Sequence, residues 1–563
     1  MPRRPPPPTG DALSRWGAPE LNATRRSLAA PSDWDLVVIG AGITGAGVAR
    51  DAALRGMRVL VLEADDVGSG TSCRSSRLVH GGVRYLEQAD FGLVFEAIRE
   101  RQSLVRLAPH LVTPQRFMLT TYRGDRVGAT RLRLGLGLYD ALSLWRARPH
   151  AFLSPKRARA AEPILSSTDL RGAVLYDDAV TDDFRLTLSV LNDARLAGAT
   201  VATHCAVASL GGQREAHRIQ LDNGPAITAR AVVVATGPWT SERLLGPVGA
   251  RLLSLSKGIH LTLRASDVPV RHPLVFQVPR SRRLLFVVPW GTRTYLGTSD
   301  DPFTGDPRDV CATPDEQSEL LAAARRWMPA ANLELDRVVS AWAGVRPLVS
   351  AGIPGNTEEL SRSHRLVESE RGVLGIVGGK LTTYRAMAEE VVDKVVAMIA
   401  PNAPNAPNAP SGWRACETAS RPVVAGEPLR PDEWSDPLIR DLAPRHGPTS
   451  RDLAARARAR PDLAARLVDD LPYRAVEIEH AITSEGAEHL DDVLRRRLPL
   501  ALADPLLGAG VARQIATMLV DHRGGTSREI DDELERYRVR VRQETSRELP
   551  AVAEPAPPLA MCR

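Results

Sequence analysis

Lysine is scarce in this chain. Only four of the 73 basic residues are lysines, namely Lys156, Lys257, Lys380 and Lys394. Arginine supplies positive charge elsewhere, and a compact ammonium is not interchangeable with a planar guanidinium. Two of the lysines fall in Gly-containing motifs, KGIH and GGKLTTYR. A lysine at such a position indicates a chemical role rather than a generic charge.

Cysteine is also rare and scattered. None of the five cysteines forms a C-x-x-C pair, so the sequence suggests neither a disulfide framework nor a zinc site. We expect no metal site and a reducing compartment. The cysteines are Cys73, Cys205, Cys311, Cys416 and Cys562.

Long apolar runs are missing as well. No stretch of eighteen apolar residues occurs, so we expect no membrane-spanning helix, and the first residues lack the apolar segment of a secretory signal. Any membrane contact would be peripheral. The 73 basic residues face 67 acidic ones along the whole length, giving a formal charge of +6 without a basic run interleaved with aromatics. We therefore expect no nucleic-acid partner.

Composition divides the chain into five parts. Residues 1–32 are Pro-rich and predicted to be disordered, and 33–400 show a mixed α/β pattern. The repeat PNAPNAPNAP cannot hold a helix, so 401–411 is predicted to be an extended linker. Apolar residues at three- and four-residue spacing predict a helical domain over 412–548. Residues 549–563 are predicted to be a flexible tail.

The strongest motif begins at DLVVIGAGITGAGVARDAALRG. Leu36 to Ile39 is a predicted strand, and a helix is expected from about Ile43. Three glycines lie between and within them: Gly40 makes a tight turn, Gly42 lets backbone approach phosphate, and Gly45 lets the helix pack on the strand. The helix N-terminus then offers N–H groups and its positive dipole end to a pyrophosphate.

A second strand, Arg58 to Leu62, ends in Glu63. A carboxylate there can accept both hydroxyls of an adenosine ribose and would repel a 2′-phosphate, so NADP is disfavoured. Strand, helix, second strand and terminal acid in register favour a dinucleotide site over an ordinary Gly-rich loop. This unit alone leaves FAD and NAD both open.

GVLGIVGGKLTTYR repeats the same physical arrangement late in the chain. Gly378 and Gly379 permit close approach, and a helix expected from near Leu381 points its N-terminus at the site. Such donors would favour hydride acceptance by a flavin, whose reduced form carries negative charge at its N1–C2=O edge. A purely structural strand-to-helix turn is the alternative interpretation.

GTSCRSSRLVHGGVRYLE, from Gly70 to Glu87, is dense in hydroxyls, glycines and cations. Its serines could bond phosphate or ribityl oxygens, and Gly81 and Gly82 would let the chain pass beside a flat ring. A polar loop with a structural hairpin is the alternative. A further strand, Ala231 to Ala235, ends in Thr236-Gly237. Such late strands ending in Gly-rich turns predict an α/β fold whose Rossmann-like domain is discontinuous, with an inserted mixed-sheet substrate (cap) domain, plus a C-terminal all-α domain.

Seven motifs together resemble the FAD-dependent glycerol-3-phosphate dehydrogenases of the aerobic, quinone-linked type. They are GAGITGAGVARDAALRG, GTSCRSSRLVHGGVRYLE, ATGPW, KGIH, PWGTRTYLGTSD, GVRPL and GGKLTTYR, and the resemblance runs from about Asp35 to Ile399. It continues more weakly into EHAITSEGAEHLDDVLRRR. The resemblance implies FAD as cofactor and oxidation of sn-glycerol 3-phosphate to dihydroxyacetone phosphate. The departures from the family pattern, Cys73 for serine and Arg77 for lysine, are mild.

The resemblance also implies site residues. His260 is expected to be the general base, with Arg346 and Lys380 polarising the alkoxide; if one of these two is the base, His260 orients the site. The substrate phosphate suits permanently charged arginines. The substrate-binding set is Arg84, Tyr85, Arg346 and Arg362. The cofactor-binding set is Gly40, Gly42, Ile43, Thr44, Gly45, Glu63, Thr71, Ser72, Ser75, Ser76, His80, Gly81, Gly82, Thr236, Gly237, Gly379, Lys380, Leu381 and Thr382.

The electron acceptor is left open between quinone and dioxygen. The apolar stretch Arg131 to His150 is either a lipid-surface segment where quinone enters or a buried cap helix. We expect a cytoplasmic enzyme, peripheral on the inner face of the cell membrane, with a homodimer among the assemblies that the sequence leaves open. The rival functions are a glycerol-3-phosphate oxidase, a flavin amine or amino-acid oxidoreductase, and a non-enzymatic nucleotide sensor. FAD is expected to bind non-covalently, although His80 lies where some related flavoproteins tether it.

Overall fold

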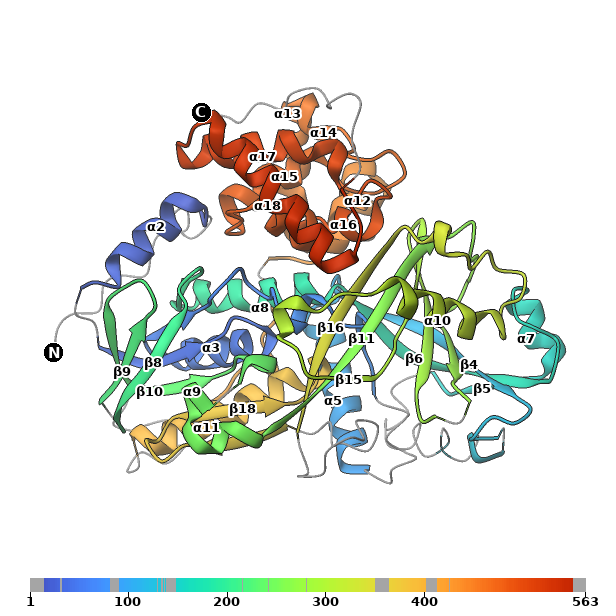
Figure 1. Ribbon diagram of the computed structural model, residues 1–563, viewed down its shortest axis with the longest axis horizontal. Helices are drawn as coiled ribbons and strands as arrows, with labels where there is room; N and C mark the ends of the chain where they lie inside the picture. The colour runs from blue at the N-terminus through green and yellow to red at the C-terminus, as the bar shows by residue number, and fades with distance from the viewer. Residues whose placement is uncertain are drawn as a thin grey trace.

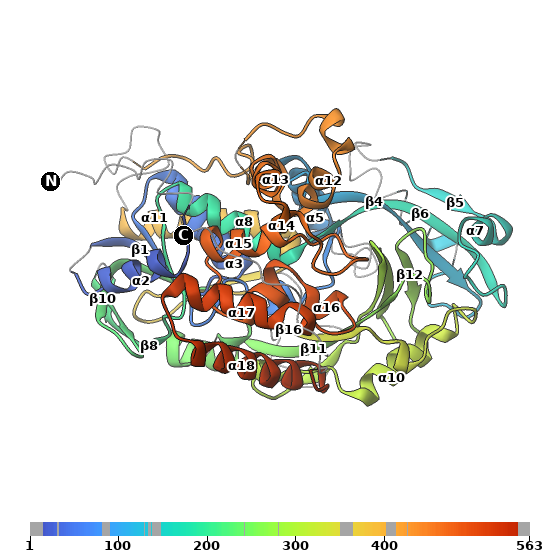
Figure 2. The ribbon, with the colours of Figure 1, turned by 90° about the horizontal axis from the view of Figure 1, so that it is seen from above.

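The computed structural model describes residues 15–30, 33–81, 91–128, 130–132, 135, 137, 148–214, 216–240, 242–279, 281–349, 364–400, 413–424 and 426–549. Two sheets lie side by side in this part of the chain, and a helical domain covers their junction (Figure 1). Seen from above, helices of that domain cross over both halves of the molecule (Figure 2).

The first sheet is built on five parallel strands in the order β18-β10-β1-β2-β7, with three antiparallel strands added at its edges. The parallel strands are β1 (Trp34–Ile39), β2 (Val59–Leu62), β7 (Thr200–Ala202), β10 (Ala226–Val234) and β18 (Leu374–Gly378). The antiparallel ones are β8 (Val207–Gln213), β9 (Ala216–Leu221) and β17 (His364–Glu368).

The central strands are apolar at every position because both faces of this sheet are covered. Leu36 and Val38 of β1 pack into a core formed with helices α3 (Ile43–Arg55), α8 (Asp183–Leu196) and α11 (Tyr384–Ile399). Val37 and Ile39 belong to a second core on the opposite face. The predicted first strand, helix and second strand are therefore confirmed.

The second sheet has ten strands among the described residues and comes from two separate insertions. The first insertion, between β2 and β7, supplies β3 (Leu78–Val79), β4 (Val112–Tyr122), β5 (Ala151–Leu153) and β6 (Leu170–Thr181). The second, between β10 and β18, supplies β11 (Leu253–Arg264), β12 (Leu274–Gln277), β13 (Leu284–Trp290), β14 (Arg293–Gly297), β15 (Asp301–Phe303) and β16 (Ser340–Val349). The predicted fold class, a discontinuous nucleotide-binding domain with a mixed cap sheet, is confirmed.

The helical domain has its own apolar core, to which Ile482, Leu494 and Ile515 contribute fully buried side chains. A π-helical turn, Asp492–Arg497, lies within it. Its principal helices are α12 (Pro437–His446), α13 (Ser450–Ala459), α15 (Ala475–Ser484), α17 (Ala509–Arg523) and α18 (Ser527–Thr545).

The prediction of disorder over 1–32 is wrong for residues 15–30. Helix α2 (Ala18–Ser27) forms there, and Trp16 and Leu21 are 3% and 0% exposed within the main core. The Trp16 N–H also donates to the carbonyl of Thr483, at 2.9 Å. The side chains of Trp16 and Leu21 thus pack into the nucleotide-binding half, and the Trp16 backbone adds a bond to the helical domain.

Several predicted segments lie outside the described residues. They include residues 1–14, the linker over 401–411, the tail from 550 onward and most of the apolar stretch 131–150. The domain boundaries stay predictions. Residues 413–424 contact the nucleotide-binding half, since Val423 packs into its core and donates to the Leu107 carbonyl. Among the helices that are described, none combines the length and apolar character needed to cross a membrane.

We predict that Leu21→Ala lowers the free energy of unfolding by about 2–5 kcal/mol, because a fully buried leucine leaves a cavity. Arg26→Ala, at an exposed position of the same helix, should change it by less than about 0.5 kcal/mol. Urea denaturation of both variants measures the difference. Equal stability of the two variants would show that α2 does not belong to the core.

Candidate functional site

A long cleft runs along the carboxyl ends of the parallel strands, between the first sheet and the cap sheet. It holds about 1220 Å³ of empty space, including the part that opens to solvent. Ligands of open parallel sheets bind at this edge. The lining residues are Ile39, Gly40, Gly42, Ile43, Thr44, Leu62, Glu63, Ala64, Ser69, Gly70, Thr71, Ser72, Ser75, Cys205, Val207, Ala235, Thr236, Gly237, Pro238, Trp239, Pro347, Ile376, Gly378, Gly379, Lys380 and Leu381.

Bare backbone forms the first wall of the cleft. Gly40 has φ +105°, and a Cβ atom there would lie 2.6 Å from the Ala235 carbonyl oxygen. A Cβ atom on Gly45 would collide with the Gly40 carbonyl oxygen, so α3 can approach β1 only through glycine. Gly42 is the N-cap of α3, whose N-terminus opens onto the cleft.

Glu63 lies at one end of this wall. Its Oε2 accepts the Ala41 N–H at 2.7 Å and its Oε1 accepts the Asp65 N–H at 3.0 Å. Burial raises the pKa of Glu63 to about 7, although these two N–H groups act in the opposite direction. Nearer the helix, the Ile43 N–H donates to Ser72 Oγ at 2.9 Å, so the segment 70–76 lies against the helix N-terminus.

The opposite wall carries the late double glycine. Gly378 and Gly379 have φ +72° and +87°, and Lys380 and Leu381 follow them along the cleft. A 3-10 turn over Leu381–Thr383 comes before α11, so the α-helix starts three residues later than expected. Thr382 of that turn accepts the N–H of His80, the residue after β3.

His260 and Arg346 lie on one face of the cap sheet. β11 and β16 are antiparallel neighbours in which His260 pairs with Trp342 and Ser256 pairs with Arg346. The His260 ring stacks on Trp342 with centroids 4.8 Å apart, and its Nε2 lies 2.9 Å from Ser76 Oγ. The side chain is 2% exposed. Burial, followed by the positive charges of Arg346 and Arg77, lowers the pKa of His260 to about 3, so its imidazole is neutral at pH 7.

Arg346 is fixed by polar groups around its guanidinium. Nη2 donates to Thr298 Oγ1 at 2.8 Å and to the Ser299 carbonyl at 3.2 Å, and Nη1 lies 3.5 Å from Asp300 Oδ1. The next residue, Pro347, lines the cleft. A permanent cation therefore lies beside the cleft in a fixed orientation.

The structure gathers most of the predicted cofactor residues in one place. Those that line the cleft are Gly40, Gly42, Ile43, Thr44, Glu63, Thr71, Ser72, Ser75, Thr236, Gly237, Gly379, Lys380 and Leu381. Those that are described but are not among its lining residues are Gly45, Ser76, His80, Gly81 and Thr382.

The residues outside the lining have other contacts. Ser76 faces His260, and the Gly81 N–H donates to Asp178 Oδ1 at 3.0 Å. The His80 N–H donates to Thr382 Oγ1 at 3.2 Å, which joins the two predicted flavin-facing segments. The predicted residues Gly82, Arg84, Tyr85 and Arg362 lie outside the described residues.

Sequence reasoning missed several lining residues. Trp239 and Pro347 were inside recognised motifs but received no role, and Cys205 and Val207 follow β7. The signal available for Cys205 was its place after a strand that proves to be parallel, because such strand ends share one edge of the sheet.

A Gly-lined helix N-terminus, a carboxylate at the end of the second strand and a cap sheet over the opposite wall define a dinucleotide-dependent oxidoreductase site. The glycines leave room for a pyrophosphate, and Glu63 and Lys380 line the same cleft of about 1220 Å³.

Comparisons with known proteins agree with this class. The model of the FAD dependent oxidoreductase family matches residues 35–392, and the model of the C-terminal domain of alpha-glycerophosphate oxidase matches 375–529. The glycerol-3-phosphate dehydrogenase of Mycobacterium leprae (strain TN) is 34% identical, over 94% of this chain and 92% of its own. The chain therefore belongs to the FAD-dependent glycerol-3-phosphate dehydrogenase and oxidase family, and its cofactor is FAD.

Solved structures give the same fold. The glycerol-3-phosphate dehydrogenase of Bacillus halodurans, complexed with FAD, aligns with a TM-score of 0.75 at 25% identity, over 95% of this chain and 99% of that one. The L-alpha-glycerophosphate oxidase of Mycoplasma pneumoniae, with FAD bound, aligns with a TM-score of 0.53 at 13% identity, over 65% of this chain and 95% of that one. The second likeness shows the fold alone.

We predict that Gly45→Ala abolishes FAD retention, because the added methyl group would collide with the Gly40 carbonyl. Gly510→Ala is the matched control: it also lies in the first turn of a helix, and outside that helix's own backbone no described residue comes within 4 Å of its Cβ position. Flavin absorbance after acid release measures the FAD content of each purified variant. A Gly45→Ala protein with full FAD content would contradict the assigned cradle.

Proposed function

We propose that this chain oxidises sn-glycerol 3-phosphate to dihydroxyacetone phosphate and passes the electrons to quinone. The observation that carries the proposal is the fixed guanidinium of Arg346 on the cap sheet, one residue before Pro347 in the cleft wall. The relative that is 34% identical over most of both chains is a glycerol-3-phosphate dehydrogenase, which supports this choice of substrate.

The substrate phosphate needs permanent positive charge. Arg346 supplies it with its orientation already set by Thr298 and Asp300, so little side-chain entropy is lost on binding. We propose Arg84, Tyr85 and Arg362 as its partners. Two-oxygen contacts from arginine would then fix the carbinol carbon relative to the cleft.

FAD, when bound, would supply the hydride acceptor for the carbinol carbon. Arg346 and Lys380 favour the alkoxide that develops on the substrate oxygen, because Lys380 lines the cleft and Arg346 is next in sequence to the lining residue Pro347. Their role is electrostatic and needs no proton transfer of its own.

His260 is the proposed proton acceptor. It is neutral in the free protein, so it can accept, but a pKa of about 3 makes it a weak base. A dianionic phosphate bound nearby would offset the repulsion from Arg346 and Arg77 and raise that pKa in the complex. The contact with Ser76 and the stack on Trp342 hold the ring in one orientation.

We predict that His260→Asn slows flavin reduction by roughly 10²-fold. Because the free-enzyme pKa lies far below 5, His260 stays neutral from pH 5 to 7.5, and the wild-type to variant ratio of kcat/KM should stay constant over that range. The ratio cancels ionisation of the substrate phosphate. A ratio that falls toward acid pH would show a titrating histidine, and near-normal flavin reduction would remove His260 from the role of base.

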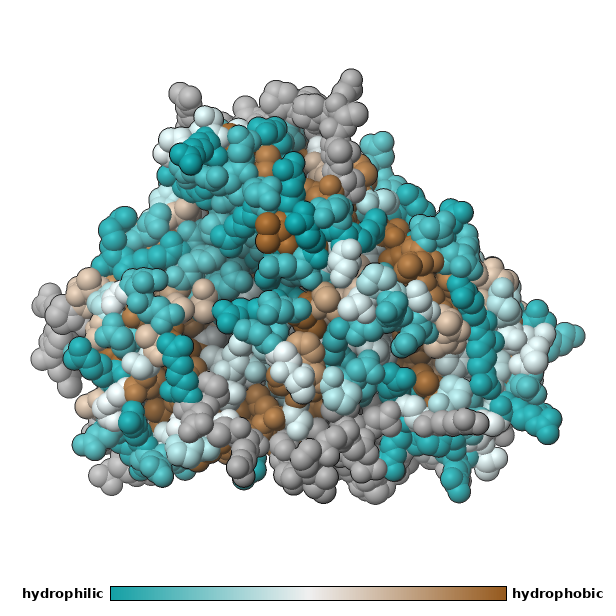
Figure 3. All heavy atoms as spheres, viewed as in Figure 1, coloured by the Kyte–Doolittle hydropathy of each residue, from teal (hydrophilic) through white to brown (hydrophobic). Residues whose placement is uncertain are grey.

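Quinone is the proposed electron acceptor. Quinone implies contact with a membrane surface, for which the stretch 131–150 is the proposed segment, although most of it lies outside the described residues. On the face seen in Figure 3, described hydrophilic side chains predominate and hydrophobic ones form small separate patches.

The test is anaerobic addition of glycerol 3-phosphate to the yellow holoenzyme. Loss of the oxidised flavin absorption within seconds is expected, with none on adding glycerol or an amino acid. An unbleached spectrum would favour a sensing role for the nucleotide, and bleaching by an amino acid would favour an amino-acid oxidoreductase. Reoxidation by a soluble quinone should outpace reoxidation by dioxygen. Stoichiometric peroxide in air with a slow quinone reaction would instead identify an oxidase.

A further inference from the structure

The helical domain binds directly to the loop that follows Glu63. Asp66, three residues on, is 1% exposed and lies between two arginines of that domain. Arg496 Nε donates to Asp66 Oδ2 at 2.5 Å, and Arg497 Nη2 donates to Asp66 Oδ1 at 2.9 Å. The π-helical turn Asp492–Arg497 brings these consecutive side chains to one carboxylate.

The loop around Asp66 in turn holds the Gly-rich turn. The Gly68 N–H donates to the Ala41 carbonyl at 3.1 Å, and the Ser69 N–H donates to the Asp66 carbonyl at 3.2 Å. Ala41 also donates its N–H to Glu63. The residue between the first two glycines of the motif is therefore bonded on both sides to the segment that Arg496 and Arg497 hold.

A second buried contact reaches the serine-rich segment. Arg74 follows Ser72 closely in sequence, and its Nη2 donates to Glu544 Oε1 of α18 at 2.6 Å. The other oxygen of Glu544 lies 2.6 Å from Arg495 Nη1. All three charged side chains are buried.

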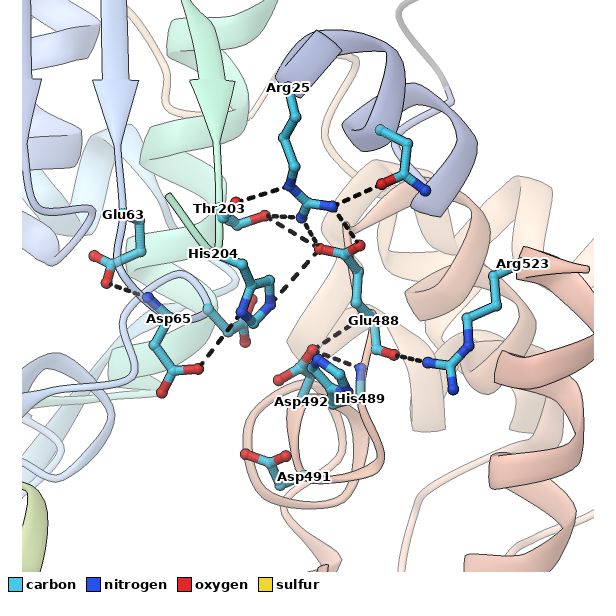
Figure 4. Close-up of polar contacts among 12 residues, drawn as sticks. Arg25, Glu63, Asp65, Thr203, His204, Glu488, His489, Asp491, Asp492 and Arg523 are labelled. Atoms are coloured by element: carbon cyan, nitrogen blue, oxygen red, sulfur yellow. Dashed lines mark hydrogen bonds and ion pairs between the residues drawn. The ribbon is translucent and has the colours of Figure 1, made fainter. Parts of the chain in front are cut away.

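A third contact lies beside Glu63 (Figure 4). Asp65, whose N–H donates to Glu63, faces the His204 imidazole at 4.0 Å, and His204 Nε2 lies 3.6 Å from Glu488 of the helical domain. Arg25 of α2 donates to Glu488 Oε1 at 3.0 Å. All three contacts therefore fall on or beside residues 63–75, which form one wall of the FAD cleft.

We propose that the helical domain acts as a clasp that positions the FAD-binding loops, with Asp66, Arg496 and Arg497 as its central positioning residues. A buried carboxylate between two guanidiniums tolerates few geometries, because displacement would leave a charge unpaired in a dry interior. Docking of the domain therefore selects the loop conformation that binds FAD. The inference rests on FAD binding alone and is independent of the substrate and of the electron acceptor.

Coupling of this kind is reciprocal. If the clasp raises the affinity for FAD, bound FAD must tighten the clasp by the same factor. Residues 491–498 are not among the residues that line the cleft, so a change in their protection on FAD binding would come through the contacts with Asp66 and Arg74 rather than through contact with FAD.

The variant Asp66→Asn tests the first direction. Its control is Asp470→Asn, which breaks an interdomain pair with Arg293 of the cap sheet at 2.6 Å, a more exposed pair whose hydrogen bonds, within the described part of the chain, do not include residues 63–75. Titration of each apoprotein with FAD should show a dissociation constant raised at least about tenfold for Asp66→Asn and within about twofold for the control. Equal weakening in both variants, or no weakening in Asp66→Asn, overturns the proposal.

Hydrogen–deuterium exchange of the wild-type full-length protein tests the reverse direction and needs no variant. Adding FAD to the apoprotein should slow exchange at residues 491–498 and leave α17 unchanged. Unchanged exchange at 491–498 overturns the proposal, even where Asp66→Asn fails to fold. Turnover of glycerol 3-phosphate does not enter either measurement, so failure of the proposed activity would leave both results standing.

Discussion

The approach of helix α3 to the end of strand β1 is the constraint on which the site depends. A methyl group at position 45 would occupy the space of the Gly40 carbonyl, so the helix reaches its place only because that side chain is missing. The cleft, the exposed helix N-terminus and the carboxylate of Glu63 all follow from this packing. The cap sheet contributes the side of the cleft that contains Pro347.

Local motifs made much of this predictable. Strands and helices around the two Gly-rich turns follow from apolar runs and glycine positions, and the late arrival of β18 is visible as a strand ending in a double glycine. The contacts of Arg496 and Arg497 with Asp66 could not be predicted from the sequence. Arg496 and Arg497 belong to a DDVLRRR segment whose charges suggest a solvated helix face, yet both are buried against Asp66, some 430 residues earlier. Single-sequence periodicity carries no information about such partners.

The scarcity of lysine also has a structural counterpart. The interdomain ion pairs described here use arginine, whose planar fork can give two hydrogen bonds to one carboxylate and keeps its charge when buried. Arg497 does so toward Asp66. Lys380 differs, because it lies in the wall of the cleft after two glycines, where a compact cation fits close to a ligand. Lys257, the other lysine in a Gly-containing motif, instead pairs with Glu316 at 2.6 Å, so the scarcity of lysine alone does not mark a lysine for chemistry.

The split nucleotide-binding sheet has a consequence for biosynthesis. A nascent chain leaving the ribosome carries β1 and β2 early, but β10 emerges only after the first cap insertion and β18 only after the second. Arg496 and Arg497, which bind Asp66 in the loop after β2, emerge later still. If the helical domain positions these loops as proposed, the FAD cleft is complete only when translation is nearly over. We therefore expect FAD to bind late and truncated products to be colourless.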